Sequence, residues 1–324
     1  MWWIGAGAFI LILIIVISTI AVSRYAFRQV TMWERSTLDK AFDAVEGFCL
    51  MSRQEFAEMA KEDVFITSED GLTLRGYYIE PYPERKKVMI IVHGYTANHI
   101  IGSQFIRLFT EEGYNVLLVD QRSHGRSEGT YATYGYYERQ DLDRWVAWVR
   151  ERVGHDAFIG LHGQSMGGGT VLMYAGINKH AKFIIADCPY SDMEDLMKYQ
   201  MKELNHVPHF PFIALLERNL KRIAQFSMKQ VKPIREVANK DIPLLLIHGK
   251  ADTFVPTRMS EQIYQEKTEG LTKLVIIDDA VHANAYPTDR QKYESAVHEF
   301  LKEVQDQYDE AGVNVWTGSN ANGA

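Results

Sequence analysis

The chain has few cysteines and no excess of basic residues. Its 324 residues include two cysteines, Cys49 and Cys188, which form no C-x-x-C pair. This count excludes a disulfide-rich scaffold and suits a reducing compartment. Lys and Arg total 35 against 42 for Asp and Glu, which gives a net charge of −7. Because nucleic-acid binding requires a basic face, this composition argues against a nucleic-acid partner.

Charge is absent from one long stretch, which runs from Trp2 to Ser23. At about 1.5 Å per residue, a helix of this length crosses the roughly 30 Å hydrocarbon core of a bilayer. We therefore expect residues 1–30 to form a single-pass membrane anchor. No Lys or Arg precedes the run, which argues against a secretory signal peptide, although cleavage after Ala21-Val22-Ser23 is an alternative.

Basic residues follow the apolar run, at Arg24, Arg28, Arg35 and Lys40. Lys and Arg next to a membrane span are retained on the inner side of the membrane. The sequence therefore predicts a cell-membrane protein whose larger part lies on the cytoplasmic side.

A serine in a glycine-rich turn is the strongest local signal. The segment Gly163-Gln164-Ser165-Met166-Gly167 follows a strand-like run, Ala157 to Leu161, and opens a helix-like one, Gly168 to Ile177. In such a nucleophile elbow the serine occupies a strained turn, and the flanking glycines remove side chains that would collide there. We therefore predict Ser165 to be a catalytic nucleophile.

A serine hydroxyl needs a general base, and the base needs a group that orients it. The apolar run Pro243 to Ile247 leads to Asp252, and the run Lys273 to Ile277 leads to His282. We predict His282 to be the base and Asp252 the orienting acid. Three other carboxylates at strand ends are alternatives for the acid: Asp187, Asp278 and Asp279.

Two backbone N–H groups are expected to bind the oxyanion that forms during acyl transfer. Met166 directly follows the nucleophile and begins a helix. Tyr95 lies in the loop after the run Val88 to Val92, where the second donor of such sites is placed. The Tyr95 side chain has an alternative role, which is to line the acyl pocket.

Eight strand signals separated by helical patterns predict an α/β fold. They are Val64–Thr67, Leu72–Ile79, Val88–Val92, Val116–Val119, Phe158–Leu161, Phe183–Ala186, Leu244–Ile247 and Leu274–Ile277. Alternation of this kind predicts a mostly parallel eight-stranded sheet with helices on both faces and an antiparallel start. We assign residues 31–62 to a helical linker, 63–310 to one catalytic domain and 311–324 to a disordered tail.

The segment 189–237 has no strand signal but many apolar and aromatic side chains. We interpret it as a helical cap over the active site, with Phe210 and Phe212 in the substrate pocket; a pair of core helices is the alternative. His206 and His209 lack further ligands at a suitable spacing, so we predict no metal site. Acyl transfer through a serine requires no cofactor, so we predict none.

The turn Asp120-Gln121-Arg122-Ser123-His124-Gly125-Arg126-Ser127 adds a further motif. Together with the serine elbow and the two later loops, it resembles the D-x-R-x-H-G-x-S turn of α/β-hydrolases over residues 64–305. More narrowly, the chain resembles bacterial membrane-anchored serine hydrolases with a small helical cap. The resemblance implies the same five site residues: Ser165, His282, Asp252, Tyr95 and Met166. Ser123 stands where the family often has glycine.

These features predict a serine hydrolase that cleaves carboxylic esters of short to medium acyl chains through an acyl-enzyme, on a small-molecule or lipid substrate. Alternatives are a thioesterase or lipid deacylase, an acyl-peptide or aminopeptidase-type amide hydrolase, and a non-catalytic binding module on the same fold. Dehalogenases and epoxide hydrolases would have aspartate at position 165. Because no predicted catalytic residue lies in residues 1–30, removal of the anchor is expected to leave a soluble, active enzyme. The sequence does not indicate the oligomeric state.

Overall fold

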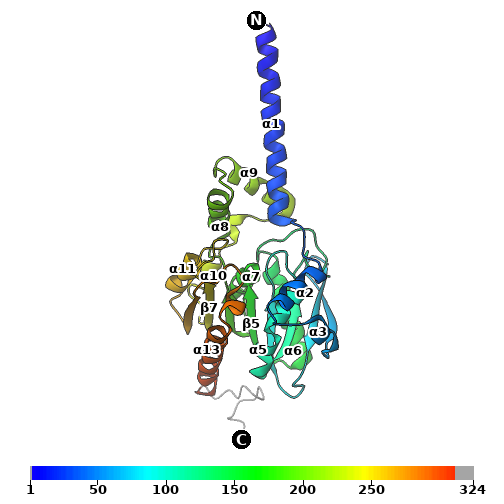
Figure 1. The fold of residues 1–324 in the computed structure, drawn as a ribbon, viewed down its shortest axis with the longest axis vertical. Coiled ribbons are helices and arrows are strands. Elements are labelled where there is room, and N and C mark those ends of the chain that lie inside the picture. Colours follow the sequence, from blue (N-terminus) through cyan, green and yellow to red (C-terminus); the bar gives the residue numbers. More distant parts are fainter. Residues whose placement is uncertain (1, 311–324) are drawn as a thin grey trace.

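The computed structural model of the chain describes residues 2–310, and the predicted disordered tail lies outside this range. Its centre is an eight-stranded sheet (Figure 1). The strands are β1 Glu62–Thr67, β2 Thr73–Ile79, β3 Lys87–Val92, β4 Asn115–Val119, β5 Phe158–Gln164, β6 Ala181–Asp187, β7 Leu244–Gly249 and β8 Thr272–Ile277. The order across the sheet is β1-β2-β4-β3-β5-β6-β7-β8. The predicted α/β sheet is confirmed, and each predicted strand overlaps an observed one.

Pairing changes direction near one edge of the sheet. β2 runs antiparallel to both β1 and β4, whereas β4, β3, β5, β6, β7 and β8 are parallel to one another. Every residue of β3, β4 and β5 is buried. This burial on both faces explains why these strands appear in the sequence as continuous apolar runs and not as alternating ones. Because the parallel strands share a direction, their carboxyl ends meet at one edge.

Helices cover both faces of the sheet, as predicted. One face packs against α2 Leu38–Gly47, α3 Arg53–Glu58, α4 His99–Gly102, η1 Ser103–Phe105, α5 Ile106–Glu111, α12 Ala285–Thr288 and α13 Arg290–Glu310. The other packs against α6 Glu138–Val153, α7 Met166–Ala175, α10 Pro233–Val237 and α11 Arg258–Glu266. The predicted linker thus contains α2 and α3, whose buried side chains Val45 and Phe56 join the core of the first face.

Between β6 and β7, the chain forms helices above the carboxyl edge of the sheet (Figure 1). These are α8 Met193–Tyr199, the π-helical turn η2 Gln200–Leu204, α9 Phe212–Asn219, a second π-helical turn η3 Leu220–Ala224 and the 3₁₀ turn η4 Met228–Gln230. α10 instead packs against α7 within the layered domain. We use the name cap for residues 193–230.

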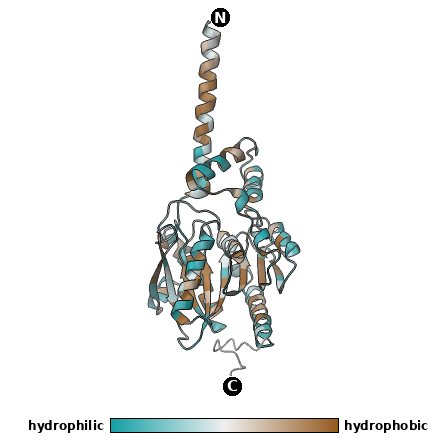
Figure 2. Cartoon of the chain, turned by 180° about the vertical axis from the view of Figure 1, so that it is seen from behind, coloured by the Kyte–Doolittle hydropathy of each residue, from teal (hydrophilic) through white to brown (hydrophobic). Residues whose placement is uncertain are grey.

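α1, Trp2–Thr31, extends far beyond the rest of the molecule (Figure 1). Its outer part is almost uniformly apolar (Figure 2), and it is long and apolar enough to cross a membrane. The inner end has a different environment. Phe27 is only 4% exposed and belongs to a third apolar core, which it shares with cap residues such as Leu216 and Leu220. α1 is therefore one helix with an exposed apolar part and a packed inner end.

Candidate active site

Ser165 occupies the turn between β5 and α7 with φ +56°, a value that non-glycine residues rarely adopt. The turn can form only with glycine on either side. A Cβ at Gly163 would lie 2.2 Å from the carbonyl oxygen of Gly167, and one at Gly167 would lie 2.0 Å from that of Val92. The glycine spacing that identified the elbow in the sequence thus has a steric cause.

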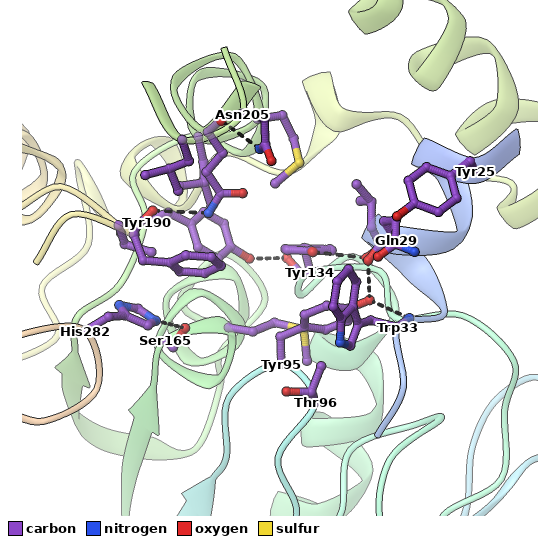
Figure 3. Close-up of a pocket in the computed structure, with 18 residues that line it drawn as sticks. Tyr25, Gln29, Trp33, Tyr95, Thr96, Tyr134, Ser165, Tyr190, Asn205 and His282 are labelled. Carbon is purple, nitrogen blue, oxygen red and sulfur yellow. Dashed lines mark hydrogen bonds between the residues drawn. The ribbon is translucent and has the colours of Figure 1, made fainter. Parts of the chain in front are cut away.

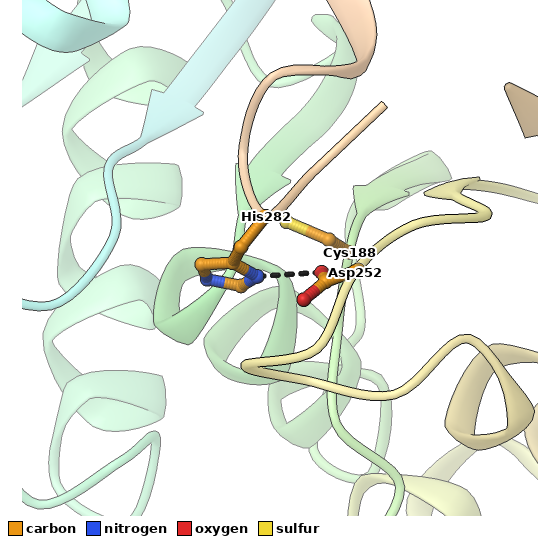
Figure 4. A group of neighbouring side chains, drawn as sticks. All are labelled: Cys188, Asp252 and His282. Atoms are coloured by element: carbon orange, nitrogen blue, oxygen red, sulfur yellow. Dashed lines mark hydrogen bonds and ion pairs between the residues drawn. The ribbon is translucent and has the colours of Figure 1, made fainter. Parts of the chain in front are cut away.

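The structure brings together the three side chains predicted as nucleophile, base and acid. Ser165 Oγ lies 2.8 Å from His282 Nε2 (Figure 3), and His282 Nδ1 lies 2.7 Å from Asp252 Oδ2 (Figure 4). The three residues follow β5, β8 and β7, so they meet at the carboxyl edge of the sheet. Their distances are those of hydrogen bonds, and the chain of contacts runs in the order that nucleophile activation requires.

The Asp252 carboxylate is held in its ionised form. Its Oδ1 accepts hydrogen bonds from the backbone N–H groups of Phe254 and Val255, each at 2.9 Å. Burial raises the pKa of Asp252, but hydrogen bonds from His248, His282 and Val255 outweigh it and hold this pKa well below its usual range. A buried carboxylate that stays charged can orient the His282 ring and stabilise an imidazolium.

None of the alternative acids forms a hydrogen bond or an ion pair with His282. Asp187 is fully buried and accepts a hydrogen bond from Gln164 Nε2 at 3.0 Å; burial raises its pKa to about 6. Asp278 and Asp279 are exposed, and Asp278 forms an ion pair with Lys250. Of the four candidate carboxylates, the structure places only Asp252 against the imidazole.

The N–H groups of Tyr95 and Met166 are free to bind an oxyanion. Neither donates a hydrogen bond to any residue within the described part of the chain. Met166 is buried at the N-terminus of α7, where the helix dipole favours negative charge. A Cβ at Gly94 would lie only 3.3 Å from Ser165 Cβ, which shows how closely the loop of Tyr95 approaches the serine.

The turn from Asp120 to Ser127 braces this loop. His124 Nε2 accepts a hydrogen bond from the Thr96 N–H at 3.1 Å, and Gln121 Nε2 donates one to the His93 carbonyl at 2.6 Å.

Ser123, at the position where the family often has glycine, adopts φ +61°. The Arg35 guanidinium donates hydrogen bonds to the carbonyl oxygen and to the hydroxyl oxygen of Ser123. The motif therefore positions the loop after β3 and contributes no group to the Ser165–His282 pair.

A cavity of about 790 Å³ opens above Ser165 and His282 (Figure 3). It lies within the size range of small-molecule sites. Its described lining consists of Tyr25, Gln29, Val30, Trp33, Tyr95, Thr96, Tyr134, Ser165, Met166, Tyr190, Leu196, Met197, Gln200, Leu204, Asn205, Phe254, Val255 and His282. The set contains no Asp, Glu, Lys or Arg, so the described wall suits an uncharged ligand.

The expectation that Phe210 and Phe212 line this pocket is not met. Neither is among the described lining residues, and Phe210 is 81% exposed. The reason is the way the cap folds. α8 covers the cavity with Leu196 and Met197, and η2 covers it with Gln200 and Leu204, while α9, which begins at Phe212, packs against α1.

Sequence reasoning missed the part of the wall that α1 and the residues just after it supply. Tyr25, Gln29 and Val30 of α1 line the cavity, as does Trp33, which follows the end of α1. A signal was present, because Tyr25 and Gln29 are spaced by four and so fall on one side of the helix. The assignment of residues 1–30 to an anchor alone concealed it.

The layered domain also provides hydrogen-bond donors for the end of α1. The last carbonyls of a helix lack partners within the helix. Tyr95 Oη donates to the Gln29 carbonyl and Tyr134 Oη to that of Val30, both at 3.0 Å, as Figure 3 shows. The Ala132 N–H donates to the carbonyl of Thr31 at 2.9 Å. Removal of residues 1–30 would therefore take away part of the pocket, although the prediction that such a protein is soluble and active stays a prediction.

Cys188, Asp252 and His282 form the one group among the described residues whose atoms are close enough to hold a metal ion (Figure 4). The chemistry of the group favours the hydrogen bond instead. Burial, with the nearby charges of Asp187 and Asp252, raises the pKa of the Cys188 thiol, and a protonated thiol is a poor metal ligand. His282 Nδ1 is engaged by Asp252.

Comparison with known proteins places this geometry in a family. The family described as "alpha/beta hydrolase fold" matches residues 87–230. The Bacillus subtilis (strain 168) protein YqkD is 33% identical over 255 residues, covering 78% of this chain and 83% of YqkD. The Escherichia coli (strain K12) protein YfhR is 27% identical over 233 residues, covering 69% of this chain and 74% of YfhR. Neither relative has a characterised function.

A solved structure has the same fold. The Pyrococcus furiosus esterase Pf2001 superposes with a TM-score of 0.62 at 27% identity, covering 78% of this chain and 96% of the esterase. The serine elbow and the strand order of the sheet agree with the matched family. The chain belongs to the α/β-hydrolase family.

Proposed function

We propose that the protein is a serine hydrolase that cleaves carboxylic esters through an acyl-enzyme intermediate. The observation that carries the proposal is the hydrogen-bonded series from Ser165 through His282 to Asp252 on a positive-φ turn. Pf2001, which shares the fold at 27% identity, is an esterase, and this supports ester cleavage over other acyl-transfer reactions.

The proposed reaction has two halves. In the first, His282 Nε2 takes the proton of Ser165 as Oγ attacks the ester carbonyl carbon, and the Tyr95 and Met166 N–H groups stabilise the oxyanion. The bond from carbonyl carbon to alcohol oxygen then breaks, and the alcohol leaves with the proton from His282. In the second, His282 removes a proton from water, the water oxygen attacks the acyl-enzyme, and the acid leaves as Ser165 regains its proton.

Phe210 and Phe212 no longer support a preference for short to medium acyl chains, since neither lines the cavity. Esters of this length are still the simplest substrates on which to test the chemistry, because they need only reach Ser165. Thioesters and amides can be cleaved by the same two-step reaction. A comparison of kcat/KM on an ester, a thioester and an amide therefore decides between these alternatives.

The test of the nucleophile uses a fluorophosphonate probe on the full-length protein. We expect the probe to label the wild type and not Ser165→Ala, and we expect kcat on a p-nitrophenyl ester to fall on the order of 10³-fold or more in that variant. Labelling of Ser165→Ala at the wild-type rate would refute the assignment. An unreactive wild type would favour a binding module on the same fold.

The test of the substrate class compares p-nitrophenyl esters of graded chain length with an acyl thioester and an aminoacyl amide. We expect kcat/KM to be highest for an ester. A higher kcat/KM for the thioester or the amide would reassign the enzyme to one of the alternative classes while leaving the role of Ser165 intact.

We also propose that α1 anchors the enzyme in the cell membrane with the catalytic domain on the cytoplasmic side. Arg24 and Arg28 are exposed at the end of the apolar part, as expected for the inner boundary of a span. Retention of the helix is favoured over cleavage after Ser23 because Asn219 Nδ2 donates a hydrogen bond to Ser23 Oγ at 2.7 Å. The apolar part of α1 thus continues directly into a segment that is packed against the cap.

A further inference from the structure

The inner end of α1 is both a continuation of the apolar helix and a part of the active-site cavity wall. It continues the apolar helix that is long enough to cross a membrane, and its residues Tyr25, Gln29 and Val30 line the cavity that contains Ser165, together with Trp33, which follows the end of α1 (Figure 3). The hydroxyls of Tyr95 and Tyr134 fix this end by their hydrogen bonds to the carbonyls of Gln29 and Val30. The cavity therefore has a fixed position relative to any bilayer that α1 spans.

That position follows from the length of the apolar run. The uncharged residues from Trp2 to Ser23 are sufficient to fill a hydrocarbon core of roughly 30 Å at about 1.5 Å per residue. The first charged residue is Arg24, and the cavity wall begins with Tyr25, about 3 Å beyond Ser23 along the helix axis. Tyr25 is 64% and Trp33 49% exposed, and both are residue types that favour the membrane–water interface.

The cap lies at the same level, because the hydrogen bond between Asn219 and Ser23 joins α9 to the end of the apolar run. In Figure 1, α9 lies beside the lower part of α1. Three basic residues of α9 and η3 are exposed close to this bond: Arg218, Lys221 and Arg222. Ile223, next to them, is 42% exposed. Basic and apolar side chains side by side are typical of a surface that contacts anionic lipid head groups.

The cavity wall indicates what kind of lipid would fit. The described lining contains no Asp, Glu, Lys or Arg, so it offers no counter-charge to a phosphate group. Its polar side chains include the amides of Gln29, Gln200 and Asn205. Gln29 Oε1 is buried without a hydrogen-bond partner among the described residues, and an unsatisfied buried acceptor of this kind is destabilising. A substrate with a free hydroxyl would supply the missing donor.

We propose that the substrate is an uncharged acylglycerol, which reaches Ser165 directly from the bilayer along the inner end of α1. This proposal rests on the proposed ester hydrolysis and names its substrate class. Ser165 attacks the acyl carbonyl, the glycerol oxygen leaves with a proton from His282, and water releases the fatty acid. The glycerol hydroxyl faces Gln29, and the acyl chain lies against the apolar wall of Val30, Leu196 and Met197.

The test uses the full-length protein in vesicles of phosphatidylcholine and phosphatidylglycerol that carry dioleoylglycerol. Release of oleate from dioleoylglycerol is measured beside hydrolysis of the water-soluble ester p-nitrophenyl acetate. Tyr25→Glu places a carboxylate where the lipid is proposed to enter the cavity. Tyr25 is 64% exposed, so a charged side chain can be accommodated at this position. Tyr264→Glu makes the same change at an exposed tyrosine of α11, outside the cavity.

We expect the wild type to release oleate from dioleoylglycerol faster than from the host phospholipids. In Tyr25→Glu the ratio of the dioleoylglycerol rate to the p-nitrophenyl acetate rate should fall about tenfold or more, whereas Tyr264→Glu should keep the wild-type ratio. A matching fall in Gln29→Leu would support the role of the Gln29 amide in binding the hydroxyl.

Three results would overturn the proposal. They are hydrolysis of p-nitrophenyl acetate without release of oleate, faster attack on the phospholipids than on dioleoylglycerol, and an unchanged rate ratio in Tyr25→Glu. In each of these results ester hydrolysis itself survives. A wild type that hydrolyses neither substrate and resists the fluorophosphonate probe would instead refute the proposed function.

Discussion

At the scale of single residues, two buried aspartates near the same histidine have opposite properties. Asp252 is surrounded by donors from Phe254, Val255 and His282, so its carboxylate stays charged. Asp187 has fewer donors, and its Oδ1 has no hydrogen-bond partner among the described residues. Burial without compensation raises the pKa of Asp187 to about 6. The hydrogen-bond environment therefore decides which carboxylate can orient a general base.

This difference predicts the activity of two matched variants. Asp252→Asn removes the charge that orients His282, and it should lower kcat on the order of 10³-fold or more. Asp187→Asn changes a group that does not contact His282, so its kcat should stay within about threefold of wild type. Both are measured on a p-nitrophenyl ester, with active sites counted by fluorophosphonate labelling. A severe loss in Asp187→Asn with an active Asp252→Asn would transfer the role to Asp187.

The raised pKa of Asp187 also predicts how stability depends on pH. A carboxyl whose pKa rises from 3.8 to about 6 on folding stabilises the native state fully below its unfolded pKa, and this contribution is lost as the pH rises through about 6. The shift corresponds to up to about 3 kcal/mol. The amide of Asp187→Asn does not titrate, so the variant cannot lose this contribution as the pH rises. The Tm of the variant minus the Tm of the wild type should therefore rise between about pH 4 and pH 8. A constant Tm difference over this range would contradict the prediction.

At the scale of secondary structure, α1 has two parts with different roles. The outer part is apolar and exposed, whereas the inner end packs against the cap and forms part of the cavity wall. Docking of the inner end depends on the hydroxyls of Tyr95 and Tyr134. Since Tyr95 also carries one of the proposed oxyanion donors, the loop after β3 joins the end of α1 to the serine turn.

Two truncations separate the roles of these parts. Removal of residues 2–22 leaves Ser23–Thr31 docked, so hydrolysis of p-nitrophenyl acetate should stay within about twofold of the full-length rate. Removal of residues 2–33 deletes one cavity wall and leaves the hydroxyls of Tyr95 and Tyr134 without their acceptors, at about 1 kcal/mol each. We expect the rate of this shorter protein to fall about tenfold or more. Equal rates in the two truncations would show that the inner end of α1 is dispensable for the chemistry.

At the scale of the whole molecule, the cap and the inner end of α1 lie on the same side of the sheet, above its carboxyl edge (Figure 1). The active-site cavity is enclosed between them and the serine turn. The apolar surface of α1 continues away from this side (Figure 2). If α1 spans a bilayer, the catalytic cavity faces the membrane, and α13 extends toward the end of the molecule opposite α1 (Figure 1).

The proposed orientation can be measured on intact cells or protoplasts treated with a membrane-impermeant protease. Because Arg24 and Arg28 favour the inner side of the membrane, we expect the catalytic domain to be protected until the membrane is permeabilised. Digestion in intact cells would place the domain outside, and the proposed location would then be wrong while the proposed chemistry would be unaffected.

Local patterns were sufficient to predict the strands, the serine turn and the positions of Asp252 and His282. A parallel strand buried on both faces must be apolar along its length, and a nucleophile elbow must have glycine at Gly163 and Gly167. Both constraints act over a few residues, so they can be read without knowledge of the fold. The same reasoning favoured Asp252 as the acid but kept three other carboxylates as alternatives, because the direction in which a loop returns depends on contacts far along the chain.

The sequence by itself determined the sheet, the serine turn and the length of an apolar helix, since each depends on neighbouring residues. Only the tertiary structure decided which carboxylate contacts His282 and which residues enclose the cavity. The hydrogen bonds that dock α1 join residues 66 and 104 positions apart. An apolar or aromatic pattern shows that a helix face will be covered but does not identify the partner that covers it. Phe210 was therefore assigned to a pocket that is formed instead by Tyr25, Gln29 and Trp33.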